Sequence, residues 1–260
     1  MIDTHAHLDV EEFAADRGEV IARAEAAGVT AIVCPAISAA SSQSVVELAG
    51  RYARLYAAVG IQPNYAAAAG AGDWDRVVAL AGRPRVVALG ETGLDRYWDY
   101  TPFDLQQDYF DRHLRLAHEH DLPVIIHCRQ AEADLLPMLR AAASRGPLRG
   151  VLHSFSGDAA LARQCLDLGL HVSFAGAVTY TNKKFEPLRA AVAAIPDDRI
   201  LVETDSPYLV PHPLRGKQQR NEPAQILLTA RRLADLRAQT LDDFDRTTTA
   251  NARRLFRLPS

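Results

Sequence analysis

The sequence predicts a (β/α)8 barrel, also called a TIM barrel, formed by residues 1–260 as a single domain. Two patterns predict it. Short apolar runs alternate with stretches of helical periodicity, and several of the apolar runs end in a histidine or an acidic residue. With 48% hydrophobic and 23% charged residues, the chain has a globular composition and enough apolar side chains for a large core. Eight strand–helix units in a chain of this length match the usual size of the barrel.

Eight short apolar or β-branched runs are expected to be the strands. Several are almost continuously apolar, such as TAIVCPAI, LPVIIHC and RILVETD, which is typical of parallel strands buried on both faces. The expected strands are residues 2–5, 29–35, 55–61, 85–90, 123–127, 150–153, 170–175 and 199–204. An open doubly wound sheet is the alternative, and the absence of a GxGxxG turn after the first run disfavours it.

The segments between these runs have the spacing of amphipathic helices. Residues 11–28 carry apolar side chains on one face and end in Gly28, which suits a helix C-terminus. Residues 103–121 form the longest such stretch. Its expected apolar face is Leu105, Tyr109, Phe110, Leu114 and Ala117. Further helices are expected at 73–81, 158–169, 223–237 and 241–256.

Five of the expected strands end in side chains that commonly bind metal ions. They are His5, His7, Glu91, His127, His153 and Asp205. In a barrel, the carboxyl ends of all strands lie at one face, where the chemistry takes place. A charge or an imidazole that ends a buried strand is costly unless it is paired or ligated, and five such endings are hard to explain by structure alone. Six ligands are too many for one tetrahedral ion and suit two adjacent ions that share Glu91 or Asp205.

The ligand chemistry limits the choice of metal. Imidazole and carboxylate together favour zinc, manganese or iron over calcium. The expected cofactors are two divalent ions, with zinc, manganese and magnesium as the choices. A carbamylated lysine cannot bridge the ions, because the first six strands contain no lysine. Glu91 is therefore expected to bridge them, and hydrolases that depend on a carbamate are disfavoured.

Six motifs in a fixed order carry a family resemblance: THAHLD, GETGLD, PVIIHCR, HSFSG, ETDSPYL and RNEP. Together they resemble the TatD family of metal-dependent deoxyribonucleases, from His5 to the NARRLF segment at 251–256. The resemblance implies a TIM-barrel hydrolase with the six residues above as its metal site. It also implies removal of nucleotides from the 3′ end of DNA, and of RNA in some cases. The chain departs from the family pattern at Gln62 and Asn64, where many relatives have histidines, which puts substrate contacts there in question.

Every lysine of the chain lies in one of two loops that are expected on the catalytic face. Lys183 and Lys184 follow the seventh strand, and Lys217 follows the eighth, close to Arg220 and Asn221 of the RNEP motif. Since the net charge of the chain is −3, this local concentration of cations indicates binding of nucleic-acid phosphates. The residues of these two loops that are expected to bind substrate are Lys183, Lys184, Lys217, Arg220 and Asn221. Solvated loop charge is the alternative explanation.

Two further features lie close to the predicted strand ends. Arg129 comes two residues after His127 and is expected to bind a phosphate through two hydrogen bonds. Tyr97, Trp98 and Tyr100 fill the loop after the fourth strand. Such aromatic side chains either stack on unpaired bases or pack a loop onto the barrel.

The expected reaction is metal-assisted hydrolysis of a phosphodiester bond at a single-stranded 3′ end. Asp205 is expected to orient the attacking water and accept its proton. Glu91, as the bridging ligand, and Glu203, as a residue that supports the metal ligands from behind, are the other expected catalytic residues. Two other functions remain open. One is hydrolysis of an amide, ester or lactone in a small molecule, and the other is binding of nucleic acid without catalysis. A substrate panel and a chelator-sensitive turnover assay distinguish them.

The cysteines and the apolar runs bear on location. Cys34, Cys128 and Cys165 are odd in number and lack CxxC spacing, which favours a reducing cytosol over a disulfide framework. No apolar run approaches the length of a membrane span, and no targeting segment is recognisable before the first histidines. The chain is expected to be a cytoplasmic monomer that binds DNA or RNA ends and no membrane.

Overall fold

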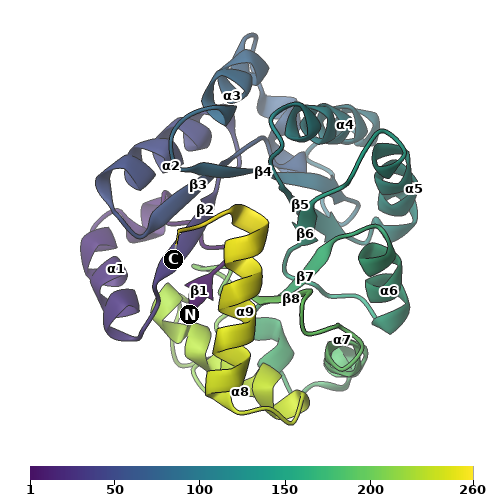
Figure 1. Cartoon of the computed structure of the whole chain (residues 1–260). Helices are drawn as coiled ribbons and strands as arrows, with labels where there is room; N and C mark the ends of the chain where they lie inside the picture. The colour runs from purple at the N-terminus through teal and green to yellow at the C-terminus, as the bar shows by residue number, and fades with distance from the viewer. Residues whose placement is uncertain (260) are drawn as a thin grey trace. The chain divides into compact units, whose positions relative to one another are not determined.

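The strands form an eight-stranded sheet whose order follows the sequence from β1 to β8 (Figure 1). The computed structural model describes residues 1–259. The strand pairs whose register is defined are parallel, and helices alternate with the strands along the chain. Because this order and this alternation define the (β/α)8 barrel, the predicted fold class is confirmed. Within residues 1–259, no helix combines the length and the apolar character that crossing a bilayer requires.

The described residues divide into two compact units. The first comprises residues 1–33, 154–166 and 171–259, and the second comprises residues 34–153 and 167–170. The expectation of one domain over the whole chain therefore stays a prediction.

The first unit contains the two ends of the sheet and the C-terminal helices. Its elements are β1 (Ile2–Asp3), α1 (Arg17–Ala26), the start of β2 (Ala31–Pro35), most of α6 (Ala159–Asp167), β7 (His171–Phe174), α7 (Glu186–Val192), β8 (Ile200–Val202), α8 (Ile226–Leu236) and α9 (Leu241–Phe256). Short 3-10 helices lie at Glu11–Phe13 (η1), Gly176–Thr179 (η3), Lys183–Phe185 (η4) and Pro223–Gln225 (η5). Its core includes the fully buried side chains of Phe174, Val202 and Phe244.

The second unit contains the middle of the sheet. Its elements are α2 (Ala39–Arg51), β3 (Leu55–Val59), the 3-10 helix η2 (Pro63–Ala68), α3 (Asp73–Ala81), β4 (Val86–Asp95), α4 (Phe103–Glu119), β5 (Val124–Arg129), α5 (Glu132–Ala143) and β6 (Gly150–Leu152). Helices α4 and α5 pack against β4 and β5 (Figure 1). Leu55, Leu89, Phe110 and Ile125 are buried in its core, as expected for strands that are apolar on both faces.

Two helical segments differ from the sequence prediction. The helix expected over residues 11–28 begins only at Arg17, because the preceding residues turn to bury Phe13, with the Arg220 guanidinium 4.7 Å from its ring. In α4, Tyr109 is only half-buried, whereas Gln106 and His113 are buried. These two polar side chains are satisfied by hydrogen bonds to backbone groups, which an apolar periodicity does not reveal.

Candidate metal centre

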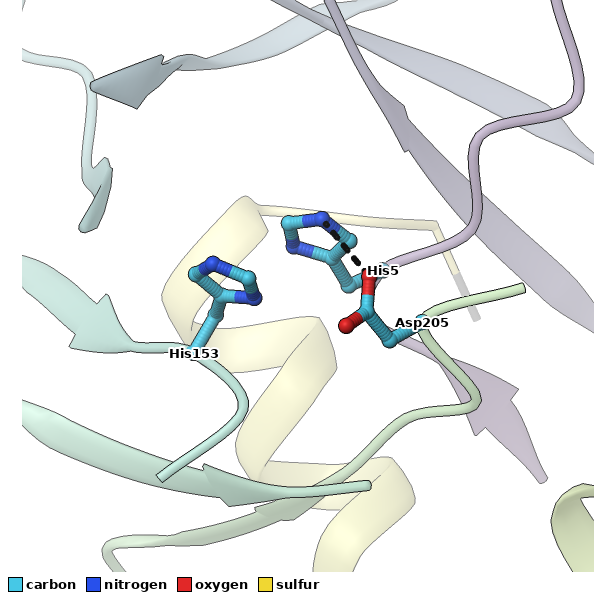
Figure 2. A group of neighbouring side chains, drawn as sticks. All are labelled: His5, His153 and Asp205. Carbon is cyan, nitrogen blue, oxygen red and sulfur yellow. Dashed lines mark ion pairs between the residues drawn. The ribbon is translucent and has the colours of Figure 1, made fainter. Parts of the chain in front are cut away.

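The six predicted metal ligands form two groups of three, one in each unit. In the first unit, His5 and His7 follow β1, and their Nε2 atoms lie 3.1 Å apart. The Oδ1 atom of Asp205 lies 3.7 Å from Nε2 of His5 and 3.6 Å from Nε2 of His7. Figure 2 shows the imidazole of His5 and the carboxylate of Asp205 facing each other. Two imidazole nitrogens and one carboxylate oxygen that converge in this way suit a divalent cation.

Asp3 holds this first group in place. Its Oδ1 accepts hydrogen bonds from the backbone N–H groups of His5 and Thr204, at 3.3 and 3.0 Å, and its Oδ2 accepts one from Oγ1 of Thr204 at 2.6 Å. The N–H of Asp205 in turn donates to the carbonyl of His5 at 2.8 Å. Burial raises the pKa of Asp3 to about 7. A single carboxyl group therefore ties the segment after β1 to the segment after β8.

The backbone at Asp205 adopts a left-handed conformation, with φ of 56°. Among residues other than glycine, Asp and Asn tolerate this conformation best. The neighbouring chain is fixed by the buried side chain of Asn221, whose Nδ2 donates to the carbonyl of Thr204 at 2.9 Å. Asn221, which is predicted from the sequence to bind substrate, thus lies behind the segment that carries Asp205.

In the second unit, Glu91, His127 and His153 form the other group. Oε1 of Glu91 lies 2.9 Å from Nδ1 of His127 and 3.2 Å from Nε2 of His153. One ligand atom from each of the three residues lies within 4.8 Å of the other two. The side chain of Glu91 is almost completely buried, so its charge needs partners of this kind. The donor set again fits a divalent cation.

The glycines of the GETG sequence allow β4 to reach this position. The register of β4 against β5 shifts between Leu89 and Thr92, in the segment that contains Glu91. At Gly93 (φ 139°), an added Cβ atom would lie 2.0 Å from the carbonyl oxygen of His127, and at Gly90 (φ 139°) it would lie 2.7 Å from that of Ile125. Since no side chain fits there, only glycine permits this close approach of the two strands.

Asp95 belongs to this candidate site, although the sequence did not predict it there. The expected fourth strand ends at residue 90, whereas β4 continues to Asp95. Oδ2 of Asp95 accepts hydrogen bonds from Nε2 of His127 at 2.9 Å and from Nδ2 of Asn64 at 3.0 Å. Its Oδ1 accepts from the N–H groups of Tyr97 and Trp98, at 2.8 and 3.1 Å. The two oxygens of Asp95 therefore accept four hydrogen bonds, about as many as the lone pairs of a carboxylate allow.

These hydrogen bonds determine the protonation of the pair. Burial alone would raise the pKa of Asp95, but the hydrogen bonds from His127 and Asn64 lower it to about 2. Burial alone would lower the pKa of His127, yet its hydrogen bonds with Asp95 and Glu91 raise it above its ordinary value. With Nε2 committed to Asp95, Nδ1 is the nitrogen of His127 that remains for a metal ion. A signal for Asp95 existed in the sequence, because Glu91, Gly93 and Asp95 alternate along one face of a strand.

The residues that depart from the family pattern also belong to this scaffold. Oε1 of Gln62 accepts a hydrogen bond from the backbone N–H of Asn64 at 2.8 Å and caps the 3-10 helix η2. The side chain of Asn64 then donates to Asp95. Both positions therefore support the predicted metal ligands of the second unit through hydrogen bonds.

Glu203 lies in the first unit and is completely buried. Its Oε1 accepts a hydrogen bond from the backbone N–H of Ser154 at 2.7 Å. Ser154 is the residue that follows His153 in the sequence. Glu203 thus fixes the chain immediately after a predicted ligand, and its catalytic role stays a prediction.

The predicted phosphate-binding lysines are exposed. Lys183 and Lys184 lie in η4, and Lys217 lies in the loop after β8. Within residues 1–259, no carboxylate forms an ion pair with any of the three. Their charges are available to a ligand, and their role in substrate binding stays a prediction.

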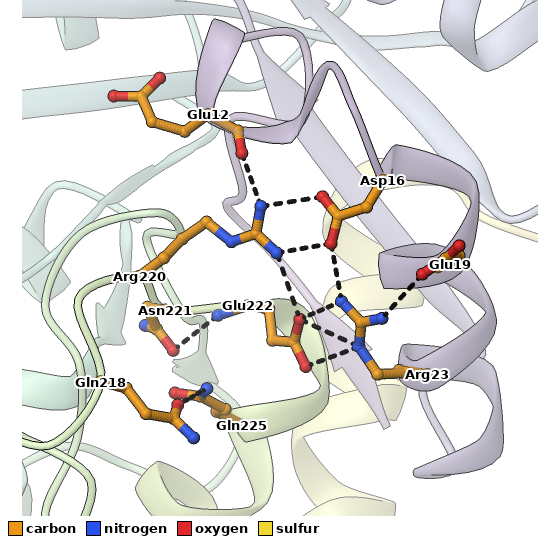
Figure 3. A network of polar contacts seen from close by, with 9 residues as sticks. All are labelled: Glu12, Asp16, Glu19, Arg23, Gln218, Arg220, Asn221, Glu222 and Gln225. Atoms are coloured by element: carbon orange, nitrogen blue, oxygen red, sulfur yellow. Dashed lines mark hydrogen bonds and ion pairs between the residues drawn. The ribbon is translucent and has the colours of Figure 1, made fainter.

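Arg220 is placed differently. Its guanidinium forms a two-point pair with the carboxylate of Asp16, at 2.9 and 2.7 Å, and also donates to the carbonyl of Glu12 (Figure 3). Arg23 completes the network by binding both Asp16 and Glu222. The hydrogen bond from Arg220 lowers the pKa of Asp16 to about 2. The charge of Arg220 is therefore balanced by an acid of the first unit, and its role in substrate binding stays a prediction.

The chain is similar to known proteins over nearly its whole length. A family model described as TatD related DNase matches residues 2–257. An uncharacterised metal-dependent hydrolase of Bacillus subtilis (strain 168), YabD, is 40% identical over 99% of both chains. The 3′-5′ ssDNA/RNA exonuclease TatD of Citrobacter koseri is 36% identical over 98% of both chains. The crystal structure of YJJV, a TatD homologue from Escherichia coli K12, superimposes with a TM-score of 0.92 at 33% identity, covering 100% of this chain and 98% of that one.

Proposed function

The chain belongs to the family of TatD related DNases and is a metal-dependent hydrolase, and we propose that it removes nucleotides one at a time from the 3′ ends of single-stranded DNA. RNA ends are the second substrate to be tested, because the relative from Citrobacter koseri is named for both nucleic acids. The observation that carries the proposal is the convergence of buried ligand atoms from Glu91, His127 and His153 within 4.8 Å of one another.

We propose that each group of three ligands binds one divalent ion. His5, His7 and Asp205 would hold one ion through two imidazole nitrogens and a carboxylate, and Glu91, His127 and His153 would hold another. Zinc, manganese and magnesium are the ions to be tested. When bound, such an ion lowers the pKa of a water molecule and polarises a phosphoryl oxygen.

The protein's own groups would then orient the reactants. The carboxylate of Asp205 is partly accessible and lies beside both imidazoles, so it can position the attacking water and accept its proton. Glu203 and Asn221 would keep the neighbouring chain in place through their hydrogen bonds to Ser154 and Thr204. No serine or cysteine nucleophile is required.

Cations outside the metal ligands would bind the nucleic-acid backbone. Arg129 is exposed at the end of β5, and Lys183, Lys184 and Lys217 carry charges that no carboxylate of residues 1–259 neutralises. Arg220, which is also predicted from the sequence to bind substrate, would contribute mainly by fixing the loop after β8 through Asp16.

The experiment that tests the function uses 5′-labelled oligonucleotides. Protein stripped with a chelator is reloaded with zinc, manganese or magnesium and incubated with a single strand, with a duplex and with a strand blocked by a 3′-phosphate. We expect a ladder of products shortened from the 3′ end, formed only with metal and only slowly from the blocked strand and the duplex. Internal cleavage, or turnover of lactones and amides without any cleavage of nucleic acid, would contradict the proposal.

We further propose that the protein acts as a monomer in the cytoplasm. The cytoplasmic location is supported by the cysteine content, since three cysteines without CxxC spacing suit a reducing compartment. Cell fractionation and sedimentation analysis of the purified protein test these two statements. Recovery in a secreted or membrane fraction, or a sedimenting dimer, would contradict them.

A further inference from the structure

The loop between β4 and α4 exposes an unusual amount of aromatic surface. Tyr97, Trp98 and Tyr100 retain 48%, 40% and 60% of their accessible surface. Only two other large hydrophobic side chains within residues 1–259, Tyr65 and Tyr208, are exposed to a similar degree. Aromatic side chains that pack a loop onto the body of a protein become buried, so packing does not explain these three.

The rings are arranged as a continuous platform. The rings of Trp98 and Tyr100 are stacked, with centroids 5.3 Å apart and an interplanar angle of 13°. Tyr97 meets Trp98 edge to face at 4.7 Å. The guanidinium of Arg129, at the end of β5, lies 3.7 Å above the ring of Tyr97 and 5.6 Å from that of Trp98. Stacking and cation–π contacts therefore join all four side chains.

The platform is held rigidly at both ends of the loop. The side chain of Gln106 bonds to the backbone N–H and C=O groups of Asp95 and also donates to the carbonyl of Thr101 at 3.1 Å. Arg96, which follows Asp95 in the loop, forms an ion pair with Asp134, and its guanidinium lies 3.6 Å above the ring of Phe103. A loop anchored in this way is preorganised for a ligand.

The same anchoring joins the platform to the predicted metal ligands. Oδ1 of Asp95 accepts the N–H groups of Tyr97 and Trp98, while Oδ2 accepts Nε2 of His127. Arg129 also lies directly opposite Asp95 in the backbone register of β4 and β5. One buried carboxylate thus fixes both a predicted metal ligand and the base of the aromatic loop.

The charge of Arg129 identifies the class of ligand. The neighbouring Arg96 is neutralised by Asp134, whereas no carboxylate within residues 1–259 forms an ion pair with Arg129. A guanidinium without a carboxylate partner recognises a phosphate, and flat exposed rings recognise the face of a base. A nucleotide with an unpaired base carries both groups next to each other.

We propose that Tyr97, Trp98, Tyr100 and Arg129 form a subsite for one unpaired nucleotide of the substrate strand, with the base stacked on the aromatic rings and its phosphate bound by Arg129. The inference rests on the proposed nuclease function and adds a physical basis for single-strand preference. In a duplex, the faces of the bases are covered by their neighbours, so a paired end must fray before it can occupy the subsite.

The first test compares kinetic constants on two substrates with identical backbones, oligo(dA) and an abasic strand of the same length. The double variant Trp98→Ala/Tyr100→Ala is expected to raise KM for oligo(dA) by roughly 10-fold, the scale of one lost base–aromatic stack, with kcat changed less than about twofold. KM for the abasic strand is expected to stay the same. Trp98→Phe/Tyr100→Phe should restore most of the loss, because phenylalanine keeps the ring face.

Tyr56→Ala is the matched control. Tyr56 is also a tyrosine stacked under an arginine, with Arg85 4.4 Å from its ring, but it lies near the start of β3 and away from the carboxyl ends of the strands. This variant should leave both KM values unchanged. Equal effects of the Trp98/Tyr100 double variant on both substrates, or no effect on either, would overturn the inference while leaving the nuclease function intact.

The second test does not require turnover. The chain has two tryptophans, so in a Trp74→Phe background the fluorescence reports on Trp98 alone. Oligo(dA) added to metal-stripped protein is expected to quench this fluorescence. The abasic strand is expected to leave it unchanged. Absence of quenching overturns the subsite even if cleavage occurs. Quenching without cleavage under any metal supports the subsite as a binding site and contradicts the proposed nuclease function.

Discussion

The Nε2 atom of His127 lies 2.9 Å from Oδ2 of Asp95, while Nδ1 of the same imidazole lies 2.9 Å from Oε1 of Glu91. Both nitrogens of one ring are therefore engaged by carboxylates, and the ring cannot rotate without losing two charge-assisted hydrogen bonds. In metal sites, a carboxylate behind a histidine fixes its orientation and its tautomer. The contact between Asp95 and His127 provides this arrangement in the second unit.

Replacing Asp95 by asparagine should weaken metal binding by about 10- to 100-fold. Asp95 accepts hydrogen bonds on both oxygens, and an amide has only one acceptor oxygen, so a donor would face either His127 or the N–H groups of Tyr97 and Trp98. Calorimetric titration of the stripped protein with zinc measures the affinity, and the 15N shifts of His127 report its tautomer. Asp134→Asn, which removes an exposed partner of Arg96, is the control. Unchanged zinc affinity and an unchanged tautomer would show that Asp95 does not position His127.

Asp205→Asn should reduce metal-dependent cleavage of oligonucleotides by more than ~10²-fold, the scale of a lost general base. Asparagine is chosen because it tolerates the left-handed backbone at this position, so the fold is expected to persist. Circular dichroism checks the fold, and initial rates with saturating metal measure the loss. Asp198→Asn, just before β8, changes an exposed acid of the same strand region and should cleave normally. Wild-type rates for Asp205→Asn would exclude Asp205 as the catalytic carboxylate.

Replacing Lys183, Lys184 and Lys217 by alanine should weaken binding of single strands and make it less sensitive to salt. Each lost phosphate contact is expected to reduce the slope of log affinity against log salt by ~0.7. A small chromogenic phosphodiester with a single phosphate should be hydrolysed almost as before. The control removes Arg76, Arg112 and Arg115, three exposed cations of α3 and α4, and has the same net charge. Identical slopes for wild type and the lysine variant would show that these loops are ordinary solvated surface.

The stability of the fold should depend on pH through His113. Burial, with a smaller contribution from Arg112, lowers the pKa of His113 to about 4. Below pH 6.5 the unfolded chain binds a proton at this residue that the folded chain does not, so its contribution to stability is lost as the pH falls from 6.5 towards 4. Between pH 7 and 5, the free energy of unfolding should therefore decrease by about 2 kcal/mol more in wild type than in His113→Gln.

Urea unfolding at the two pH values measures this difference. Glutamine can still accept the hydrogen bond from the N–H of Ile61, which limits damage to the fold. His120→Gln, at the exposed end of α4, should retain the wild-type pH dependence. The same pH dependence in His113→Gln as in wild type would contradict the assignment.

The sequence predicted the elements of the fold well because its strong signals are local. Nearly continuous apolar runs marked the strands, and the side chains directly after them marked the predicted ligands. The extension of β4 to Asp95 was missed because glycine and polar residues interrupt the apolar pattern at GETG. The buried Gln106 and His113 were missed for a related reason, since their burial depends on backbone groups of β4 and of the segment after β3.

The partners of charged side chains were the least predictable part. Arg220 and Asp16 are 204 residues apart in the sequence, and nothing local indicates that they form a pair. Arg96 and Arg129 look equivalent as sequence, and both lie over aromatic rings. Of the two, only Arg96 forms an ion pair within residues 1–259, with Asp134. Interpretation of a basic cluster therefore requires knowledge of which cations the fold itself has already neutralised.

The close approach at Gly93 also limits how the protein can evolve. An added Cβ atom would lie 2.0 Å from the carbonyl oxygen of His127, so even alanine would push apart the strands that carry two predicted ligands. Substitutions at Gly93 should therefore be rejected both in natural evolution and in directed evolution. The exposed loop at residues 97–100 has no such restriction on its side chains. A library of variants selected for new substrates should therefore keep Gly90 and Gly93 invariant and vary the side chains of that loop. Specificity can then change there while the strands that carry the predicted ligands keep their positions.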